Sequence, residues 1–367
     1  MAIKDVDKRV SESLAEAMAK ARGSAAAMAE PEPEVKKALP KAKKYKDRYG
    51  DVKFSEVFGF PPPDGMPDLK AVVYSKKNWP KTDWPFIPEK SKFHDYVPNV
   101  EVLYQLWVSV LRNNKKALVV GPTGSGKSSL QEYFCAFIHQ PMFRINGRGD
   151  MESDTLLGRP WVGKGGMEFI KGDLVVAAEK GHWILIDEPW KLPAPIQMAL
   201  QRFYEKDGQF QLDDMPGSME EKLITPDPKC RLVLCDNVVG TGDNIDQYAA
   251  TMIQDGSTLN RIDVVFRQEY MKPELEVEML VRACPDIGEH NARHMVDFVA
   301  LCRVSYQQRA LSAALSPRNL LTWAELAIQL ESITTAAKWT FADRYAEDDE
   351  QQLIADHFKT VFDEVLR

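Results

Sequence analysis

Residues 117–130 read Ala-Leu-Val-Val-Gly-Pro-Thr-Gly-Ser-Gly-Lys-Ser-Ser-Leu, and this stretch decides the fold. Its four leading apolar residues predict a short buried strand, and residues 129–137 predict the helix that follows. Between them, Gly121 to Ser128 fit the pattern Gly-x-x-x-x-Gly-Lys-Ser of phosphate-binding loops, in the strand–turn–helix context that this pattern requires. The stretch therefore predicts a nucleotide-binding α/β domain rather than a chance glycine-rich turn.

The chemistry of this loop (the P-loop) predicts sites for ATP and Mg²⁺. Glycines allow backbone N–H groups to point at phosphate oxygens, and the positive end of the following helix strengthens that field. We expect Lys127 to neutralise the β- and γ-phosphates and the Ser128 hydroxyl to ligate Mg²⁺. The candidate nucleotide-binding residues are Gly121, Pro122, Thr123, Gly124, Ser125, Gly126, Lys127, Ser128 and Ser129.

Composition narrows the class of protein. The chain has 367 residues, of which 44% are hydrophobic and 28% charged, as is usual for a soluble protein of two or three structural units. A net charge of -7 argues against a surface that follows nucleic acid throughout. The five cysteines form no metal-ligand spacing and no apolar run reaches membrane-spanning length, so we expect reduced thiols, a cytoplasmic location and no membrane association.

Changes in composition predict four parts of the chain. Residues 1–50 form a flexible charged tail, read either as a solvated linker or as a basic patch for a partner. Residues 51–98, rich in proline and aromatic side chains, form an N-terminal docking segment of irregular structure. Residues 99–270 alternate strands and helices and predict a three-layer αβα domain with a parallel sheet. Residues 271–367 predict a small helical lid domain that includes a C-terminal helix.

Hydrophobic patterns predict the individual elements. Strands are expected at 143–145, 183–186, 231–235 and 263–266, and hairpin insertions at 163–172 and 210–224. Helices are expected at 102–111, 195–204, 273–283, 289–308, 317–331 and 348–366.

A second acidic motif ends the strand at 183–186. We expect Asp187 to hold Mg²⁺ together with Ser128, and Glu188 to polarise the attacking water. Asn237 follows the strand at 231–235, where its amide could orient the same water, although Asp-Asn is also common turn chemistry. The simpler interpretation of Asp187-Glu188 is a turn at the end of a strand.

The order of these motifs resembles that of the AAA+ ATPases, and in detail that of the MoxR branch and the CobS-type ATPase subunits of aerobic cobaltochelatase. The resemblance covers about residues 51–335. It rests on Val57-Phe58-Gly59, Tyr96-Val97-Pro98, Asp154-Thr155-Leu156-Leu157-Gly158, Asn237-Val238-Val239-Gly240-Thr241-Gly242-Asp243, Leu259-Asn260-Arg261 and Ser316-Pro317-Arg318.

This resemblance implies further roles. Asn237 is expected to be the first sensor, Arg318 the second sensor, and Arg261 an arginine finger that acts on the ATP of a neighbouring subunit. Asn260 departs from the aspartate usual before the finger. Arg267 is a rival for that role, and the simpler interpretation of Arg261 is that it caps a strand. A finger acting in trans implies a homo-oligomeric ring, by resemblance a hexamer.

Three functions compete. The first is a ring-forming ATPase that remodels or activates a partner protein complex, in the manner of MoxR-type ATPases. The resemblance to that branch implies a partner with a von Willebrand A-type domain on a separate chain. The second is the motor subunit of a chelatase that inserts cobalt into a tetrapyrrole. The third, a nucleic-acid motor or packaging factor, is disfavoured by the net charge and by Asp187-Glu188-Pro189-Trp190 in place of a helicase box.

Two smaller features stay open. Trp161, Lys164 and Phe169, in or near the first hairpin, could contact a substrate or only pack the hairpin. His290 and His294 have the spacing of a metal pair on a helix, but no third ligand is evident.

Overall fold

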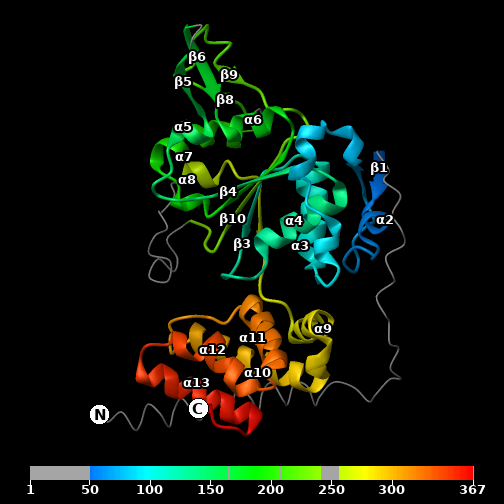
Figure 1. Ribbon diagram of the computed structural model, residues 1–367. Coiled ribbons are helices and arrows are strands. Elements are labelled where there is room, and N and C mark those ends of the chain that lie inside the picture. The colour runs from blue at the N-terminus through cyan, green and yellow to red at the C-terminus, as the bar shows by residue number, and fades with distance from the viewer. Residues whose placement is uncertain (1–49, 164–165, 206–207, 241–255, 367) are drawn as a thin grey trace. The chain divides into compact units, whose positions relative to one another are not determined.

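The computed structural model describes residues 50–163, 166–205, 208–240 and 256–366 (Figure 1). All of the described residues belong to one compact unit of the chain. The predicted tail, apart from Gly50, lies outside the described residues, as do Lys164 and the end of the sensor motif, Thr241-Gly242-Asp243.

A parallel five-stranded sheet forms the centre of the described fold. Its strands are β3 (Ala117–Val120), β4 (Met142–Asn146), β7 (Trp183–Asp187), β10 (Arg231–Asp236) and β11 (Val264–Arg267), in the order β11-β3-β10-β7-β4. Each neighbouring pair is parallel, so the carboxyl ends of all the strands lie along one edge. The P-loop, Glu188 and Asn237 each follow a strand at that edge.

Helices cover both faces of this sheet, as Figure 1 shows. Along β3, Ala117 and Val119 pack into a core with the helices of one face, whereas Leu118 and Val120 pack into a second core on the other face. This alternation follows from the period of two along a strand, and both faces are apolar because both are covered. The predicted three-layer αβα architecture is confirmed.

The first face carries α3 (Val100–Gln105) and α4 (Lys127–Ile138). Asn99 caps α3 because its Oδ1 accepts hydrogen bonds from the backbone of Glu101 and Val102. The single helix expected at 102–111 begins earlier and widens into a π-helical segment over Leu106–Arg112. On the other face lie α5 (Ser153–Leu156), α6 (Asp173–Glu179), α7 (Ala194–Tyr204) and α8 (Gly256–Leu259).

Two antiparallel hairpins extend from the sheet domain. They are β5 (Gly158–Gly163) with β6 (Gly166–Lys171), and β8 (Phe210–Gln211) with β9 (Leu223–Ile224). The first hairpin was expected to start at residue 163, but it starts at Gly158. Pro160 argues against a strand in the sequence, yet a two-stranded hairpin tolerates proline because each strand has one unpaired edge. In this hairpin Trp161 is half exposed, whereas Phe169 packs against the core of the second face.

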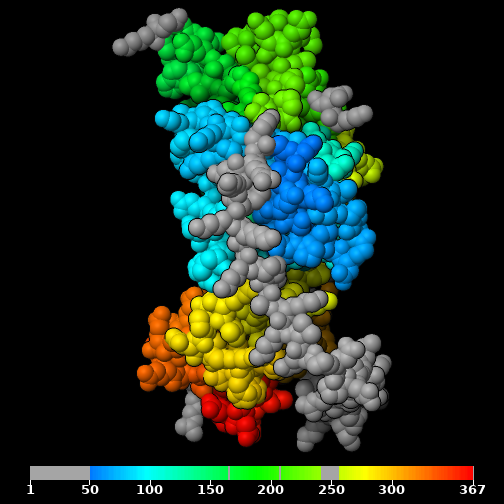
Figure 2. Space-filling view, turned by 90° about the vertical axis from the view of Figure 1, so that its right-hand side faces the viewer, coloured from blue at the N-terminus to red at the C-terminus, as the bar shows by residue number. Residues whose placement is uncertain are grey.

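The segment before the sheet domain is more regular than expected. It contains β1 (Gly50–Lys53) and β2 (Lys70–Val73), which pair antiparallel, and α2 (Phe54–Phe58) between them. Phe54 and Phe58 are buried against Trp107, with ring centroids 5.8 and 5.9 Å apart. The blue surface of this segment consequently adjoins the cyan surface of the sheet domain in Figure 2. The strands were missed because each alternates over only four residues and a proline-rich loop separates them.

Five α-helices follow β11 in the described residues. They are α9 (Pro273–Ala283), α10 (Gly288–Gln307), α11 (Pro317–Gln329), α12 (Ile333–Thr340) and α13 (Asp348–Phe362). Phe298, Trp323, Phe341 and Phe358 are buried at the centre of their shared core. The sequence did not predict α12, and α13 ends at Phe362 rather than at residue 366 because Asp363 turns left-handed, with a φ of 54°.

One contact of the docking segment joins two cores. Tyr96 packs against the core of the first sheet face, whereas its neighbour Val97 is buried in the core of the helical region.

None of the described helices is long and apolar enough to span a membrane. All five cysteines are buried and unpaired.

Candidate active site

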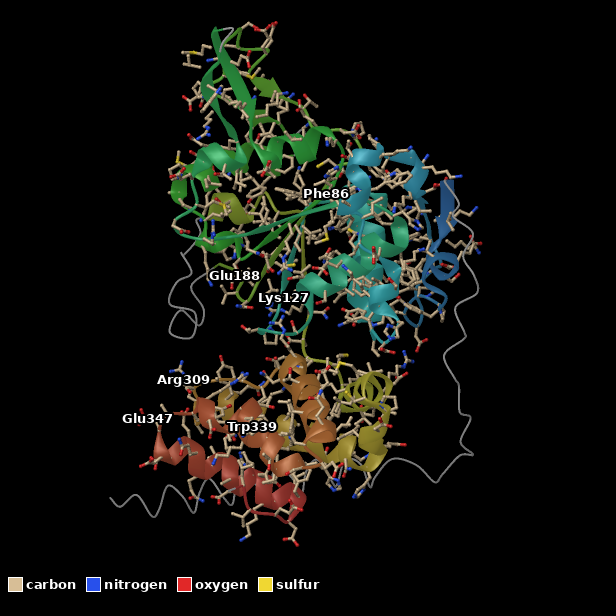
Figure 3. The ribbon with its side chains drawn as sticks, viewed as in Figure 1. Phe86, Lys127, Glu188, Arg309, Trp339 and Glu347 are labelled. Atoms are coloured by element: carbon tan, nitrogen blue, oxygen red, sulfur yellow. The ribbon has the colours of Figure 1, made fainter. Side chains whose placement is uncertain are left out.

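A cavity of about 700 Å³ opens at the carboxyl edge of the sheet. Residues 123–129 of the P-loop line it, together with Asp187, Glu188, Asn237 and Arg318. Lys127 and Glu188 are labelled in Figure 3, where both lie at this edge of the sheet domain. The structure thus brings together most of the residues that the sequence singled out, from four separate stretches of the chain.

Lys127 lies at the base of this cavity. Its Nζ donates to the carbonyl oxygens of Gly121 and Pro122, at 2.7 and 3.0 Å, and to Oδ1 of Asn237, at 2.9 Å. Burial lowers the pKa of Lys127, and nearby acidic groups such as Asp187 act against that shift. A buried ammonium whose three hydrogen-bond partners are neutral favours an anionic ligand.

Two glycines of the P-loop are required by close packing. Gly124 has a φ of +76°, and a Cβ there would lie 2.4 Å from Cβ of Ser316, at the start of α11. A Cβ on Gly121 would lie 1.9 Å from the carbonyl oxygen of Gln268. The P-loop therefore packs closely against the segment after β11 on one side and the start of α11 on the other. Neither Gly121 nor Gly124 leaves room for a side chain.

Ser128 and Asp187 meet as the sequence predicted. The Ser128 hydroxyl donates to Oδ2 of Asp187 at 2.7 Å. Arg144 of β4, which the sequence analysis did not single out, also donates to this oxygen, at 2.6 Å from Nη2. Because β4 pairs with β7, Arg144 reaches the aspartate from the adjacent strand.

Glu188 has an unusual backbone. Its φ and ψ are 56° and 51°, the left-handed region that few residues other than glycine adopt. The Glu188 amide donates to the carbonyl of Cys235 at 2.7 Å, and a Cβ on Gly147 would lie 2.1 Å from the Glu188 carbonyl oxygen. Its carboxylate lines the cavity and pairs with Lys191 at 2.9 Å. Neighbouring strands therefore fix this turn and aim the carboxylate at the cavity edge.

Asn237 is held by a buried carboxylate beside it. Oδ1 of Asp236 accepts the backbone amides of Asn237, at 2.7 Å, and Val238, at 3.3 Å. Burial raises the pKa of Asp236 to about 6, although these backbone hydrogen bonds act to lower it. Asp236 thus orders the turn that presents Asn237 to Lys127.

The two predicted arginines occupy different places. Arg318, in the first turn of α11, lines the cavity, and Ser316 caps that helix through a reciprocal pair of hydrogen bonds with Asn319. Arg261 does not line the cavity. It precedes β11, at the opposite edge of the parallel sheet, where its guanidinium contacts Glu205 at 3.3 Å and the Ser257 carbonyl at 2.9 Å.

Arg267, the rival to Arg261, ends β11 in register with Val120. It is exposed and does not line the cavity.

Sequence reasoning missed several residues of the site. Arg144 stands out in the sequence as the charged residue of a short strand, but its place beside the acidic motif depends on the order of the strands in the sheet. Gln268 is buried, and its Nε2 donates to the carbonyl of Ser125 at 3.1 Å, but no sequence pattern marks it. Tyr96 and Val97, from the docking segment, also line the cavity, so this segment contributes to the site as well as to packing.

The possible metal pair gains no support. The rings of His290 and His294 lie 4.3 Å apart, but the described residues contain no group of three His, Cys, Asp or Glu side chains placed to hold a metal.

The donor set nevertheless fits ATP with Mg²⁺. A hydroxyl and a carboxylate in contact are hard oxygen ligands of the kind that Mg²⁺ takes beside substrate phosphates. The P-loop adds a buried cation and backbone amides, and Gly124 and Gly126, with φ of +76° and +88°, have the left-handed conformation that turns those amides inward. Val97, Met271, Met279 and Leu321 supply an apolar wall suited to a base.

The fold is an α/β P-loop fold, and residues 116–251 match the family described as AAA domain (dynein-related subfamily). The chain is similar to the aerobic cobaltochelatase subunit CobS of a Sinorhizobium species, with 28% identity over 291 residues that cover 75% of this chain and 86% of that protein. The predicted resemblance to AAA+ proteins and to CobS is therefore confirmed.

Two further similarities were found. Midasin of Dictyostelium discoideum is 26% identical over 257 residues, which cover 67% of this chain but 4% of midasin. A solved structure of a variant of RuvB from Thermotoga maritima aligns with a TM-score of 0.42 and 15% identity, over 72% of this chain and 75% of that one.

Proposed function

We propose that this protein is a ring-forming AAA+ ATPase that couples ATP hydrolysis to the remodelling or activation of a partner protein complex. The observation that carries the proposal is that the two predicted arginines, Arg318 and Arg261, lie at opposite edges of the sheet. Arg318 lies in the same cavity as Lys127, Asp187 and Glu188, whereas Arg261 lies at the opposite edge of the sheet. Because Arg261 does not line the cavity of its own chain, we assign it to the nucleotide of a neighbouring subunit.

Each side chain has a defined part in the proposed reaction. Lys127 and the P-loop amides bind the phosphates of ATP, and Ser128 and Asp187 would hold Mg²⁺, which neutralises charge on the β- and γ-phosphates when bound. Glu188 accepts a proton from the attacking water, while Asn237 orients that water. Arg318 from α11, and Arg261 from the neighbouring subunit, stabilise negative charge that develops on the transferred phosphoryl group.

Arg144 needs a separate assignment. Its bond to Asp187 places a positive charge where Mg²⁺ would be held, so Arg144 must release that oxygen when the metal binds. Glu132 and Asn146 offer alternative partners, at 3.3 and 3.1 Å from the same guanidinium. We expect Arg144 to keep Asp187 in place in the metal-free state.

The ring follows from this assignment, whereas the partner rests on the resemblance to MoxR-type ATPases. A finger supplied in trans requires a closed homo-oligomer in which each site has a neighbour, and we propose a hexamer. The partner would be a separate chain with a von Willebrand A-type domain, and the cytoplasmic location stays a prediction.

One alternative function is favoured by a specific observation. The similarity to CobS extends over 75% of the chain and 86% of that subunit, so the complex served by this ATPase could be a chelatase that inserts cobalt into a tetrapyrrole. This alternative keeps the same ATPase chemistry and changes only the partner.

The function is tested with two substitutions in the full chain. Lys127→Ala should abolish ATP binding measured by calorimetry, because the cation of the P-loop is lost. Glu188→Gln should still bind ATP but hydrolyse it at least about 100-fold more slowly, since the amide keeps the shape and removes the base. Equal hydrolysis rates for Glu188→Gln and the unmodified chain would contradict the assignment of the base.

The Glu188→Gln chain also identifies the partner. Held in its ATP-bound form, it should retain its partner in affinity purification from the source cells, and Lys127→Ala should not. Recovery of a chain with a von Willebrand A-type domain together with tetrapyrrole-binding subunits would favour the chelatase, and recovery of the former without the latter would favour the remodelling ATPase.

A further inference from the structure

The segment after β11 connects the P-loop to the helical region through a chain of polar contacts. The Tyr270 hydroxyl donates to the carbonyl oxygen of Thr123, in the P-loop, at 2.9 Å. The guanidinium of Arg303, from α10, lies over the Tyr270 ring, with Cζ 4.0 Å from the ring centroid. Tyr270 therefore touches the P-loop with its hydroxyl and the helical region with its ring.

Arg303 extends this chain to the start of α11. Its Nε donates to the carbonyl of Leu315 at 2.8 Å, one residue before the Ser316 cap and three before Arg318. Its Nη1 and Nη2 each contact a carboxylate oxygen of Glu276, from α9, at 2.9 Å. The edges of the guanidinium thus donate hydrogen bonds to Leu315 and Glu276, and its face stacks on the Tyr270 ring. Lysine cannot reproduce this geometry.

The burial of this pair is not explained by stability alone. Glu276 is 1% exposed and Arg303 is 9% exposed. A buried ion pair typically contributes little more to stability than apolar side chains of similar size, because desolvation offsets the attraction. What it provides is a fixed arrangement of the elements that it joins, here α9, α10 and the turn before α11.

We propose that Tyr270, Arg303 and Glu276 are positioning residues that hold Arg318 over the nucleotide and make its placement depend on the P-loop. The inference rests on the proposed nucleotide-binding function and assigns these three residues a part in it. Because Tyr270 bonds a P-loop carbonyl, a shift of that loop on binding ATP is transmitted through the ring to Arg303. From Arg303 it reaches the Leu315 carbonyl and the first turn of α11.

The test is a double-mutant cycle on ATP affinity, measured by calorimetry with the full chain. Tyr270→Phe removes the hydroxyl that bonds Thr123 and keeps the ring beneath Arg303. Loss of one such hydrogen bond should weaken ATP binding about 2- to 10-fold. In the Arg318→Ala background the same change should have no further effect, because the side chain through which Tyr270 acts is absent.

Tyr345→Phe is the matched control. Tyr345 also donates its hydroxyl to a backbone carbonyl, that of Ala313 at 2.9 Å, but within the helical region. It should lower thermal stability without weakening ATP binding. Arg303→Lys, which keeps the charge beside Glu276, should weaken ATP binding as Tyr270→Phe does, and the two changes together should be no worse than either alone.

The possible results distinguish a failure of the proposed function from a failure of the coupling between Tyr270 and Arg318. If the unmodified chain fails to bind ATP, the proposed function is wrong and this inference fails with it. If the chain binds ATP and Lys127→Ala does not, only the coupling is at issue. An unchanged affinity for Tyr270→Phe, an equal loss with and without Arg318, or no effect of Arg318→Ala would each overturn the coupling.

Discussion

Gly124→Ala tests whether the P-loop and the first turn of α11 pack as closely as the structure indicates. Gly124 has a φ of +76°, and its missing Cβ would lie 2.4 Å from Cβ and 2.9 Å from Oγ of Ser316. Alanine in the left-handed conformation costs about 1–2 kcal/mol. Forcing a methyl group into an occupied site costs a further 1–3 kcal/mol, roughly. We therefore expect the free energy of unfolding to fall by about 2–5 kcal/mol.

Two other glycines separate these contributions. Gly126 has a φ of +88°, but the nearest atom to its Cβ position is the Tyr96 hydroxyl oxygen at 3.7 Å, so Gly126→Ala should show the conformational cost alone. Gly149 has an ordinary φ, and its nearest atom, the Lys191 carbonyl oxygen, is 4.0 Å away, so Gly149→Ala should be close to neutral.

A second-site change tests the steric contribution directly. Ser316→Gly removes the atoms that the new methyl group meets, and glycine at a helix cap costs only a few tenths of a kcal/mol. Combined with Gly124→Ala, it should restore about 1–3 kcal/mol in urea unfolding and part of the ATP affinity. If the double variant is no more stable than Gly124→Ala alone, the close contact between the P-loop and α11 does not exist as described.

Three further predictions concern the active site and the assembly. Arg261→Ala subunits and Lys127→Ala subunits, each inactive alone, should recover part of the ATPase activity when they are mixed. Some interfaces of a mixed ring pair an intact P-loop with an intact arginine finger, which is worth about 10³–10⁵ in rate. If rings of confirmed mixed mass recover no activity, the finger role moves to Arg267. Non-hydrolysable ATP should favour the ring over the monomer in light scattering at micromolar concentration, because the nucleotide binds the assembled state better, and persistent monomer would count against the trans site. Burial raises the pKa of Asp236 to about 6 from 3.8, so the folded state binds more protons than the unfolded chain between these pH values. The free energy of unfolding should therefore fall by about 3 kcal/mol as the pH rises through this window. Asp236→Asn should remove this pH dependence of stability, measured by denaturant unfolding.

The sheet domain could be predicted because its signals are local. Each core strand is a short apolar run, and the P-loop and Asp187-Glu188 follow two of them directly, so chain order alone places these residues at one edge. Ser128 and Asp187 meet for this reason. The same reasoning places Asn237 at this edge, and its role as a sensor came from the resemblance to AAA+ ATPases.

The residues that the sequence could not predict depend on contacts between distant segments. Arg144 reaches Asp187 because β4 lies beside β7, and strand order is not written in either strand. Gln268 and Tyr270 follow β11 without any motif, and they matter only because β11 lies next to β3. The left-handed backbone of Glu188 arises from packing against Gly147 and Cys235, which no local preference for glutamate indicates.

Tyr96 and Val97 are consecutive residues that belong to different hydrophobic cores. One peptide bond thus ties the sheet domain to the helical region, in addition to the connection after β11. The close packing of Gly124 against Ser316 and the contacts of Tyr270 join the same two regions, so neither region can unfold without losing contacts of the other. The described part of the chain should consequently unfold on heating in one cooperative transition.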